Sequence, residues 1–264
     1  MAHRGASKSA PENTLAAFRA ARSAGADLYE LDVQQTKDQE LVVIHDATLA
    51  RTTNAEEVFP DRSPWRVRDF TLAELRQLDA GSWFGARYAG EPIPTLSDVL
   101  RVMKGTPGLL LEVKRPAGAP GMAESLAALL PQAPPTTIIQ SFDWQFIKSL
   151  HTRTERAVLG TPTLADLPQI AKYARYISVK HEIATPAYVR RAHALGLKVL
   201  TYTVNTRRAT QRQLRAGVDG LITNRPRNLR YYLPAGPTAP RWKPVRSPAF
   251  SGVPLVTAPP SAAP

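Results

Sequence analysis

The sequence contains no cysteine and no long apolar run. With no cysteine among 264 residues, disulfide bonds, thiolate metal ligands and cysteine nucleophiles are excluded. The longest apolar runs, near Leu41–Ile44 and Leu109–Leu111, are far shorter than the ~20 residues of a membrane-spanning helix. The first residues have neither the basic start nor the apolar stretch of a signal peptide. We therefore expect no stable membrane insertion, and the sequence leaves the compartment unassigned.

Acidic residues are scarce relative to basic ones. The 22 Asp and Glu stand against 34 Lys and Arg, a formal net charge of +12, which favours anionic partners such as phosphate esters. Six of the basic residues lie between Arg225 and the end, where there is no acid at all. Basic and aromatic residues are not interleaved on a recognisable platform, so we predict no nucleic-acid partner.

Strand-like and helix-like segments alternate over most of the chain, which predicts a largely parallel α/β fold. The expected strands after the start are 28–33, 109–113, 136–140, 156–160, 176–179, 198–204 and 220–223. A short strand before His3 brings the number to eight, and Leu41–Ile44 is an extra hairpin arm. Eight strands alternating with helices predict a (β/α)8 TIM barrel, whose reactive groups lie at the carboxyl ends of the strands.

The chain divides by composition into a long domain and a tail. Residues 1–233 form the predicted domain, and about 51–95 are an insertion, because this stretch is too long for a simple loop. Residues 234–264 are rich in proline and alanine and have no apolar periodicity. Such a composition predicts a disordered tail rather than a second domain.

Three acids interrupt two apolar strand segments. Side chains alternate along a strand, so Glu30 and Asp32 share one face, as do Glu112 and Lys114 in the later segment. Carboxylates that converge in a buried place repel one another, and a hard divalent cation such as Ca²⁺ or Mg²⁺ relieves that conflict. For any single acid, an ordinary ion pair is the alternative. Three acids together with two histidines favour a metal site.

Two histidines stand at predicted strand ends, His3 at the start of the chain and His45 after an apolar run. Breaking a P–O bond needs proton transfer at both the attacking and the leaving oxygen, and two histidines supply one transfer each. Arg4 and Lys114 are donors suited to a phosphate diester. The remaining histidines are assigned ordinary structural roles: His151, His181 and His193.

A series of short motifs follows one order along the chain up to about Pro226. They are His3-Arg4-Gly5, Pro11-Glu12-Asn13-Thr14, Gly25-Ala26-Asp27, Glu30-x-Asp32, Thr36-Lys37-Asp38, Val43-x-His45-Asp46, Arg51-Thr52-Thr53, Ile93-Pro94-Thr95-Leu96, Glu112-x-Lys114, Gln140-Ser141-Phe142, Thr203-Val204-Asn205 and Gly217-Val218-Asp219-Gly220. This order resembles that of the glycerophosphodiester phosphodiesterases. Each tripeptide alone is weak evidence for the resemblance, but this many motifs in the same order are highly specific to the family.

The resemblance implies a TIM-barrel phosphodiesterase that cleaves glycerophosphodiesters to glycerol 3-phosphate and an alcohol. A hydroxyl of the substrate's own glycerol attacks phosphorus, and water then opens the cyclic phosphate. The implied roles are a single Ca²⁺ or Mg²⁺ held by Glu30, Asp32 and Glu112, acid–base catalysis by His3 and His45, and substrate contacts from Arg4, Lys114 and Tyr202.

Three positions depart from the family's pattern. Gln39 stands where glycine is frequent, and Tyr202 replaces a common tryptophan while keeping an aromatic wall. Asn224 replaces an aspartate of the last strand, which removes a charge at the barrel mouth.

The start of the chain is a further departure, because two residues alone, Met1 and Ala2, precede His3. We expect such a first strand to pair poorly. This suggests a natural start upstream, with mass spectrometry of the translated N-terminus as the test.

Two other functions are compatible with these residues. A lysophospholipase D would use the same chemistry on lysophospholipids, with an apolar ramp in the insertion built by Trp65, Phe70, Trp83 and Phe84. An inactive phosphate-binding barrel would have lost a histidine or an acid, and none is lost.

Overall fold

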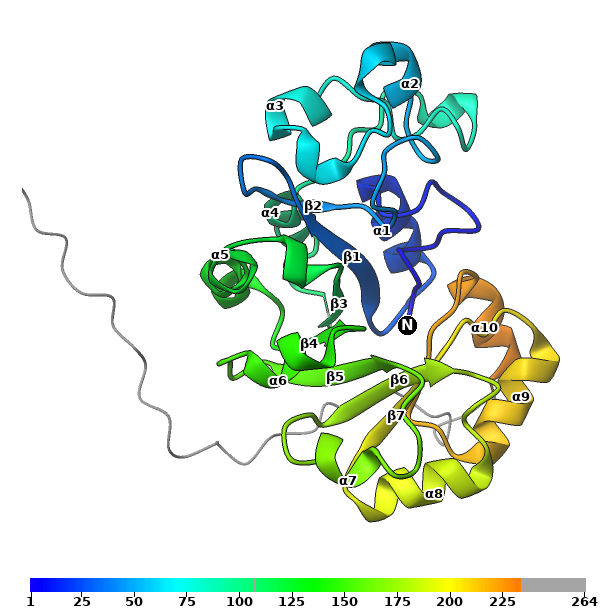
Figure 1. Ribbon diagram of the computed structural model, residues 1–264. Helices are drawn as coiled ribbons and strands as arrows, with labels where there is room; N and C mark the ends of the chain where they lie inside the picture. The colour runs from blue at the N-terminus through cyan, green and yellow to red at the C-terminus, as the bar shows by residue number, and fades with distance from the viewer. Residues whose placement is uncertain (107, 234–264) are drawn as a thin grey trace, which may run out of the picture.

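A curled parallel sheet organises the computed structural model, which describes residues 1–106 and 108–233 (Figure 1). Its parallel strands follow one another in chain order: β1 (Tyr29–Gln35), β3 (Gly108–Val113), β4 (Thr136–Ser141), β5 (Glu155–Gly160), β6 (Tyr176–Lys180), β7 (Lys198–Tyr202) and β8 (Gly220–Leu221). The short strand β2 (Leu41–Val43) pairs antiparallel with β1 as the predicted hairpin arm.

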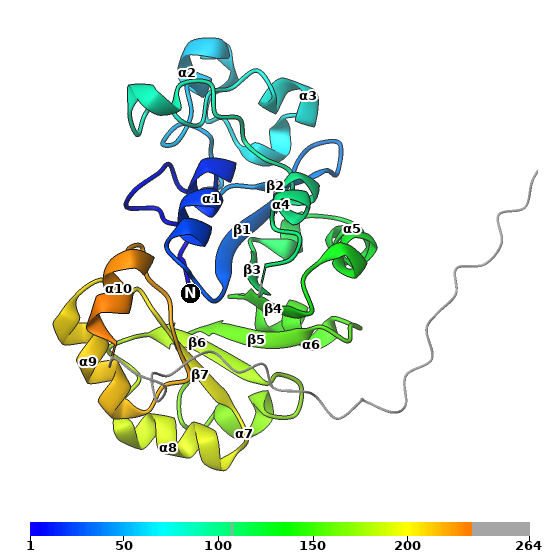
Figure 2. The ribbon, with the colours of Figure 1, turned by 180° about the vertical axis from the view of Figure 1, so that it is seen from behind.

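Most helices lie on the outside of the sheet, whereas α2 (Ala55–Val58) and α3 (Leu72–Leu75) stand apart from it, in the segment between β2 and α4 (Leu96–Val102), as both views show (Figures 1 and 2). Most helices begin at a Thr or Asp whose side chain accepts a backbone N–H of the first turn, as at Thr14 and Thr185. The other helices are α1 (Leu15–Ser23), α5 (Met122–Leu129), α6 (Trp144–Ser149), α7 (Leu167–Ile170), α8 (Pro186–Ala194), α9 (Arg207–Ala216) and α10 (Pro226–Tyr232).

The first residues connect β1 with the segment that follows β8. Ala2 forms parallel bridges with Tyr29 on one side and Thr223 on the other. His3 N donates to Thr223 O at 2.9 Å, and Thr223 N donates to Met1 O at 3.0 Å. The expectation that this strand pairs poorly is therefore wrong, because one bridged residue with flanking hydrogen bonds is enough to complete the predicted eight strands. It also fixes His3 at the carboxyl end of the first strand.

Two apolar layers explain where polar side chains can lie. The outward side chains of β1, Leu31 and Val33, pack beneath the helices in the main core. The inward positions form a second cluster inside the barrel that includes Leu28, Leu110, Ile138, Tyr176, Leu200 and Ile222. Leu28 and Leu110 precede the inward acids Glu30 and Glu112, so apolar side chains fill the amino end of the barrel and these acids lie at its carboxyl end.

The segment between β2 and α4 has an apolar cluster of its own, formed by residues such as Ile44, Leu49, Phe70, Leu75 and Ile93. Phe70 is fully buried there and Trp65 packs against the same cluster, so these two aromatics stabilise the segment instead of building an exposed ramp. Trp83, by contrast, is 42% exposed and meets Phe84 edge to face.

The described part of the chain has no helix long and apolar enough to cross a membrane. The predicted disordered tail, residues 234–264, lies outside the described residues.

Candidate active site

The three predicted metal ligands converge at the carboxyl end of β1 and β3. Asp32 and Glu112 are register partners in this parallel pair, and Glu30 lies one inward position before Asp32. An oxygen of each carboxylate lies within 4.8 Å of the others, and the three residues are 1%, 1% and 7% exposed for Glu30, Asp32 and Glu112. Strand periodicity and register thus place three carboxylates in one small buried volume.

Two cations lie against these carboxylates. Lys114 Nζ is 2.7 Å from Glu112 Oε1 and 3.6 Å from Asp32 Oδ1. Arg4 Nε is 3.3 Å from Asp32 Oδ2, and the Arg4 backbone N–H donates to Glu30 Oε2 at 2.6 Å. With all five groups ionised, the charges sum to −1, so the cluster retains an unbalanced negative charge. Asp32 Oδ1 has no hydrogen-bond partner among the described residues.

Burial and mutual repulsion shift the proton affinities of the acids. Burial, with Asp32 and Glu112 adding repulsion, raises the pKa of Glu30 well above its ordinary value. Burial and the charge of Asp32 raise the pKa of Glu112 to about 7. Burial also opposes ionisation of Asp32, but Arg4 and Lys114 outweigh it and hold the pKa of that carboxyl below its ordinary value. Without a bound cation, the site therefore keeps protons where a metal would require carboxylates.

Asn13 orients Asp32 and was not predicted as a site residue. Its Nδ2 donates to Asp32 Oδ2 at 2.8 Å, and Asp32 N donates to Asn13 Oδ1 at 3.3 Å. Its backbone is left-handed, with φ 58°, a conformation that asparagine tolerates better than most residues. The Pro11–Thr14 motif was the sequence signal, but its pairing with Asp32 depends on the fold.

The turn after the first strand is tight at Gly5. Its φ is +78°, and a Cβ there would lie 2.6 Å from the carbonyl carbon of Ala17 in α1. Arg4 is also left-handed, with φ 54°. The turn at Arg4 and Gly5 thus packs closely against α1, and the Arg4 N–H in the same turn donates to Glu30.

His3 lies beside Asn224, with Nδ1 2.5 Å from Asn224 Oδ1. An amide oxygen accepts only, so this contact places a proton on Nδ1 and leaves Nε2 as the acceptor. Burial and the positive charge of Arg4 lower the pKa of His3 to about 4, so the ring is neutral at pH 7. Asn224 was noticed in the sequence only as a departure, whereas in the fold it orients the histidine.

His45 is held by a charged partner instead. Its Nδ1 is 2.6 Å from Asp46 Oδ1, and Asp46 Oδ2 accepts from Arg51 Nε at 2.5 Å. The hydrogen bond from Arg51 is the largest of several effects that lower the pKa of Asp46 to about 2, so this carboxylate is ionised. The two predicted catalytic histidines therefore have chemically different supports, a neutral amide and a fixed carboxylate.

Glu12 links the two sides of the site, a contact that sequence reasoning missed. Its Oε1 accepts from Arg51 Nη2 at 2.6 Å and from Arg4 Nη1 at 2.9 Å. Arg4 contacts Asp32, and Arg51 contacts Asp46. A continuous set of ion pairs thus connects the carboxylate cluster to the support of His45.

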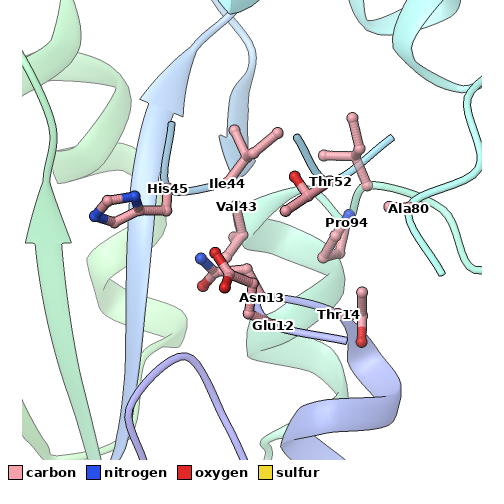
Figure 3. Close-up of a pocket in the computed structure, with 10 residues that line it drawn as sticks. Glu12, Asn13, Thr14, Val43, Ile44, His45, Thr52, Ala80 and Pro94 are labelled. Carbon is pink, nitrogen blue, oxygen red and sulfur yellow. The ribbon is translucent and has the colours of Figure 1, made fainter. Parts of the chain in front are cut away.

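A cavity of about 10 Å³ lies next to this set, lined by Glu12, Asn13, Thr14, Val43, Ile44, His45, Thr52, Ala80, Ile93 and Pro94. Figure 3 shows the His45 ring pointing away from the other lining side chains. A volume of this size holds about one water molecule, so a phosphodiester has to approach from the barrel mouth instead.

Tyr202, the predicted aromatic wall, is half-buried at the end of β7 and packs against the inner apolar cluster. Burial and the charge of Glu112 raise its pKa to about 12, so its hydroxyl stays neutral. Lys114 Nζ lies 5.9 Å from the ring of Phe142, which is 58% exposed. The other three histidines lie outside this site: His193 pairs with Asp219, His181 contacts Arg212, and His151 is exposed.

The fold and the site together define an α/β-barrel phosphodiesterase, with acids, cations and histidines at the carboxyl ends of the strands. The chain belongs to the glycerophosphoryl diester phosphodiesterase family, whose model matches residues 3–228.

Relatives of similar length extend this result. A glycerophosphodiester phosphodiesterase of Caldanaerobacter subterraneus is 36% identical over 239 residues, which are 87% of this chain and 95% of that protein. One from Bacillus subtilis is 35% identical, with 86% and 83% covered. An Oleispira antarctica phosphodiesterase, solved with its product sn-glycerol-3-phosphate, superposes with a TM-score of 0.79 at 29% identity, covering 88% of this chain and 94% of that one.

Proposed function

We propose that this chain hydrolyses glycerophosphodiesters to glycerol 3-phosphate and an alcohol in a metal-dependent reaction. The observation that carries the proposal is the convergence of Glu30, Asp32 and Glu112 within 4.8 Å, beside two cations. The product bound to the Oleispira antarctica relative supports the same product here.

The residues present fit a hard divalent cation. Three carboxylates offer oxygen donors, and the buried Asp32 Oδ1 lacks a hydrogen-bond partner among the described residues. Ca²⁺ and Mg²⁺ prefer such ligands, so Glu30, Asp32 and Glu112 would hold the ion. When bound, the ion supplies charge stabilisation for oxygens that become negative during the reaction.

The different supports of the histidines favour different roles in the first step. His3, kept neutral by burial and with Nε2 as the acceptor, takes the proton of the attacking glycerol hydroxyl. His45, backed by the ionised Asp46, gives a proton to the leaving alcohol. As the new P–O bond forms, the bond to the alcohol breaks and a cyclic phosphate results.

In the second step the two roles reverse. Water attacks the cyclic phosphate, loses its proton to one histidine, and the glycerol oxygen that leaves phosphorus is protonated by the other. Arg4 and Lys114 bind the phosphate oxygens as donors, and the neutral ring of Tyr202 forms a wall of the site.

The direct test measures glycerol 3-phosphate released from glycerophosphocholine with Ca²⁺, Mg²⁺ or a chelator present. We expect metal-dependent release, and a loss of ~10²–10⁴ in kcat for His3→Ala and for His45→Ala. His151→Ala, at an exposed histidine outside the site, is the matched control and should keep full activity. If the folded protein releases no glycerol 3-phosphate with either metal, the proposal is contradicted.

A second candidate keeps this chemistry but uses a lysophospholipid. The exposed aromatic side chains of Trp83 and Phe142, 42% and 58% exposed, favour it, because they can contact an acyl chain. Parallel assays with glycerophosphocholine and lysophosphatidylcholine decide between them through the ratio of the two kcat/KM values.

A further inference from the structure

A cleft outside the active site lies between α1 and α10, which stand next to each other in both views (Figures 1 and 2). Its volume is about 560 Å³, within the range of small-molecule sites. Its walls come from the turn after the first strand, from the outer side of α1 and from the start of α10. The lining residues are Ala6, Lys8, Ser9, Ala20, Ser23, Ala24, Arg225, Pro226, Arg227 and Asn228.

The charge of this cleft has one sign. Lys8, Arg225 and Arg227 are exposed, and among the lining residues identified there is no carboxylate. Within residues 1–106 and 108–233, none of these three side chains has an ion pair or a hydrogen bond. This contrasts with Arg4, Arg51 and Lys114 in the active site, each of which contacts an acid. Concave walls that carry one sign of charge concentrate the opposite ion.

None of the described residues that line the cleft is an acid, a cation or a histidine of the candidate active site. Lys8 N donates to Asn224 O at 3.1 Å, and this bond joins the turn to the segment that follows β8. Asn224 directs its side chain inward to His3, while the next residue, Arg225, lines the cleft. The cleft therefore has its own lining residues, although a ligand in it would lie next to the segment that contains Asn224, the residue that orients His3.

We propose that the cleft between α1 and α10 is a second binding site, which takes a small phosphate-bearing anion at Lys8, Arg225 and Arg227. A dianion there relieves the repulsion among three cations and gains charge-assisted hydrogen bonds, of the forked kind from the two arginines. Ser9, Ser23 and Asn228 add neutral polar groups to the lining, which suit the hydroxyls of a phosphate ester.

The test follows backbone amide resonances of the full chain while inorganic phosphate is added at constant ionic strength. We expect saturable shifts at Lys8, Arg227 and Asn228. The double variant Arg225→Gln/Arg227→Gln should bind phosphate at least about tenfold more weakly at these amides, because two charged donors are lost. Glycerol 3-phosphate titrated in parallel distinguishes a phosphate ester from free phosphate as the preferred ligand.

The matched control is Arg208→Gln/Arg215→Gln, which removes the same two charges from exposed positions of α9. It should leave the cleft affinity unchanged. Equal weakening by the two double variants would mean that net charge alone attracts phosphate, and the absence of saturable shifts would mean that the cleft is no site. Either result overturns the proposal. The hydrolysis assay is independent of it, since Arg225→Gln/Arg227→Gln should retain wild-type kcat.

Discussion

At the scale of single residues, the histidines were predicted from the sequence, but the residues that orient them were not. Asn224 orients His3, and Asp46 with Arg51 orients His45. Side-chain alternation was enough to put Glu30 and Asp32 on one face of a strand, and the expected parallel order of neighbouring strands brought Glu112 to them. Asn224 reaches His3 across 221 positions, and Arg51 reaches Glu12 across 39. Contacts of this kind depend on how the whole barrel closes, so no local pattern predicts them.

Asn224→Leu tests the support of His3. The substitution removes the oxygen that accepts from Nδ1 at 2.5 Å, so the ring loses its fixed tautomer and orientation, and kcat should fall about tenfold to hundredfold. Asn224→Asp should retain activity. Its charge favours the protonated ring, so the pKa of His3 should rise from about 4 and the acid limb of the kcat/KM profile should move to higher pH. An Asn224→Leu enzyme with unchanged kcat would contradict this role.

Arg51→Lys tests the support of His45. Lysine keeps the charge but cannot reproduce the fork that holds Asp46 and Glu12. Because Arg51 does not reach the carboxylate cluster, we expect kcat to fall about tenfold with KM nearly unchanged. Arg62→Lys is the control, since Arg62 pairs with Glu74 in the same insertion and is similarly exposed, at 39% against 44%. Equal effects of the two substitutions would show a general loss of stability instead.

At the scale of elements, strands and most helices were predictable because their apolar periodicity is strong. The seven expected strands after the start correspond to β1 and β3 to β8, although β7 ends at Tyr202 rather than Val204. The pairing of the first strand was predicted wrongly, because it depends on bridges from one residue, Ala2, and so short a strand has no apolar pattern. Helix α10 leaves little apolar periodicity to predict it from, because it is short and has two buried residues, Pro226 and Leu229.

Gly5→Ala tests the contact between the first turn and α1. A left-handed backbone costs alanine about 1–2 kcal/mol of folding free energy. The Cβ of alanine would also lie 2.6 Å from the carbonyl carbon of Ala17. Gly196→Ala has nearly the same φ, +76°, but no atom within 4 Å of the added Cβ. Urea denaturation should therefore show that Gly5→Ala costs at least about 2 kcal/mol more than Gly196→Ala. Equal costs would mean that the turn relaxes without strain.

At the scale of the whole molecule, metal affinity should depend on pH through the buried acids. The pKa of Glu112 in the fold, about 7, lies above its ordinary 4.5. Its proton therefore stabilises the metal-free fold fully below pH 4.5, and that contribution is lost as the pH rises through 7. Because metal must displace this proton below pH 7, and the raised pKa of Glu30 acts in the same direction, calorimetry should find Ca²⁺ binding at least about tenfold weaker at pH 6 than at pH 8.

The control for this linkage is Glu124→Gln, at an exposed acid of α5, which should keep the same pH dependence. Affinity that is constant from pH 6 to pH 8 would show that Glu112 is already ionised without metal, or that it does not bind the ion.

The insertion and the barrel divide the proposed chemistry between two separately packed units. The carboxylates stand on β1 and β3 above the barrel's inner cluster, whereas Arg51 belongs to a segment with its own apolar cluster. Partial unfolding of that segment alone would release Asp46 from Arg51 while the carboxylates stay in place. Under mild denaturation, the enzyme should thus pass through a state that still binds its metal ion but has no catalytic activity. Activity should therefore be lost before the barrel unfolds.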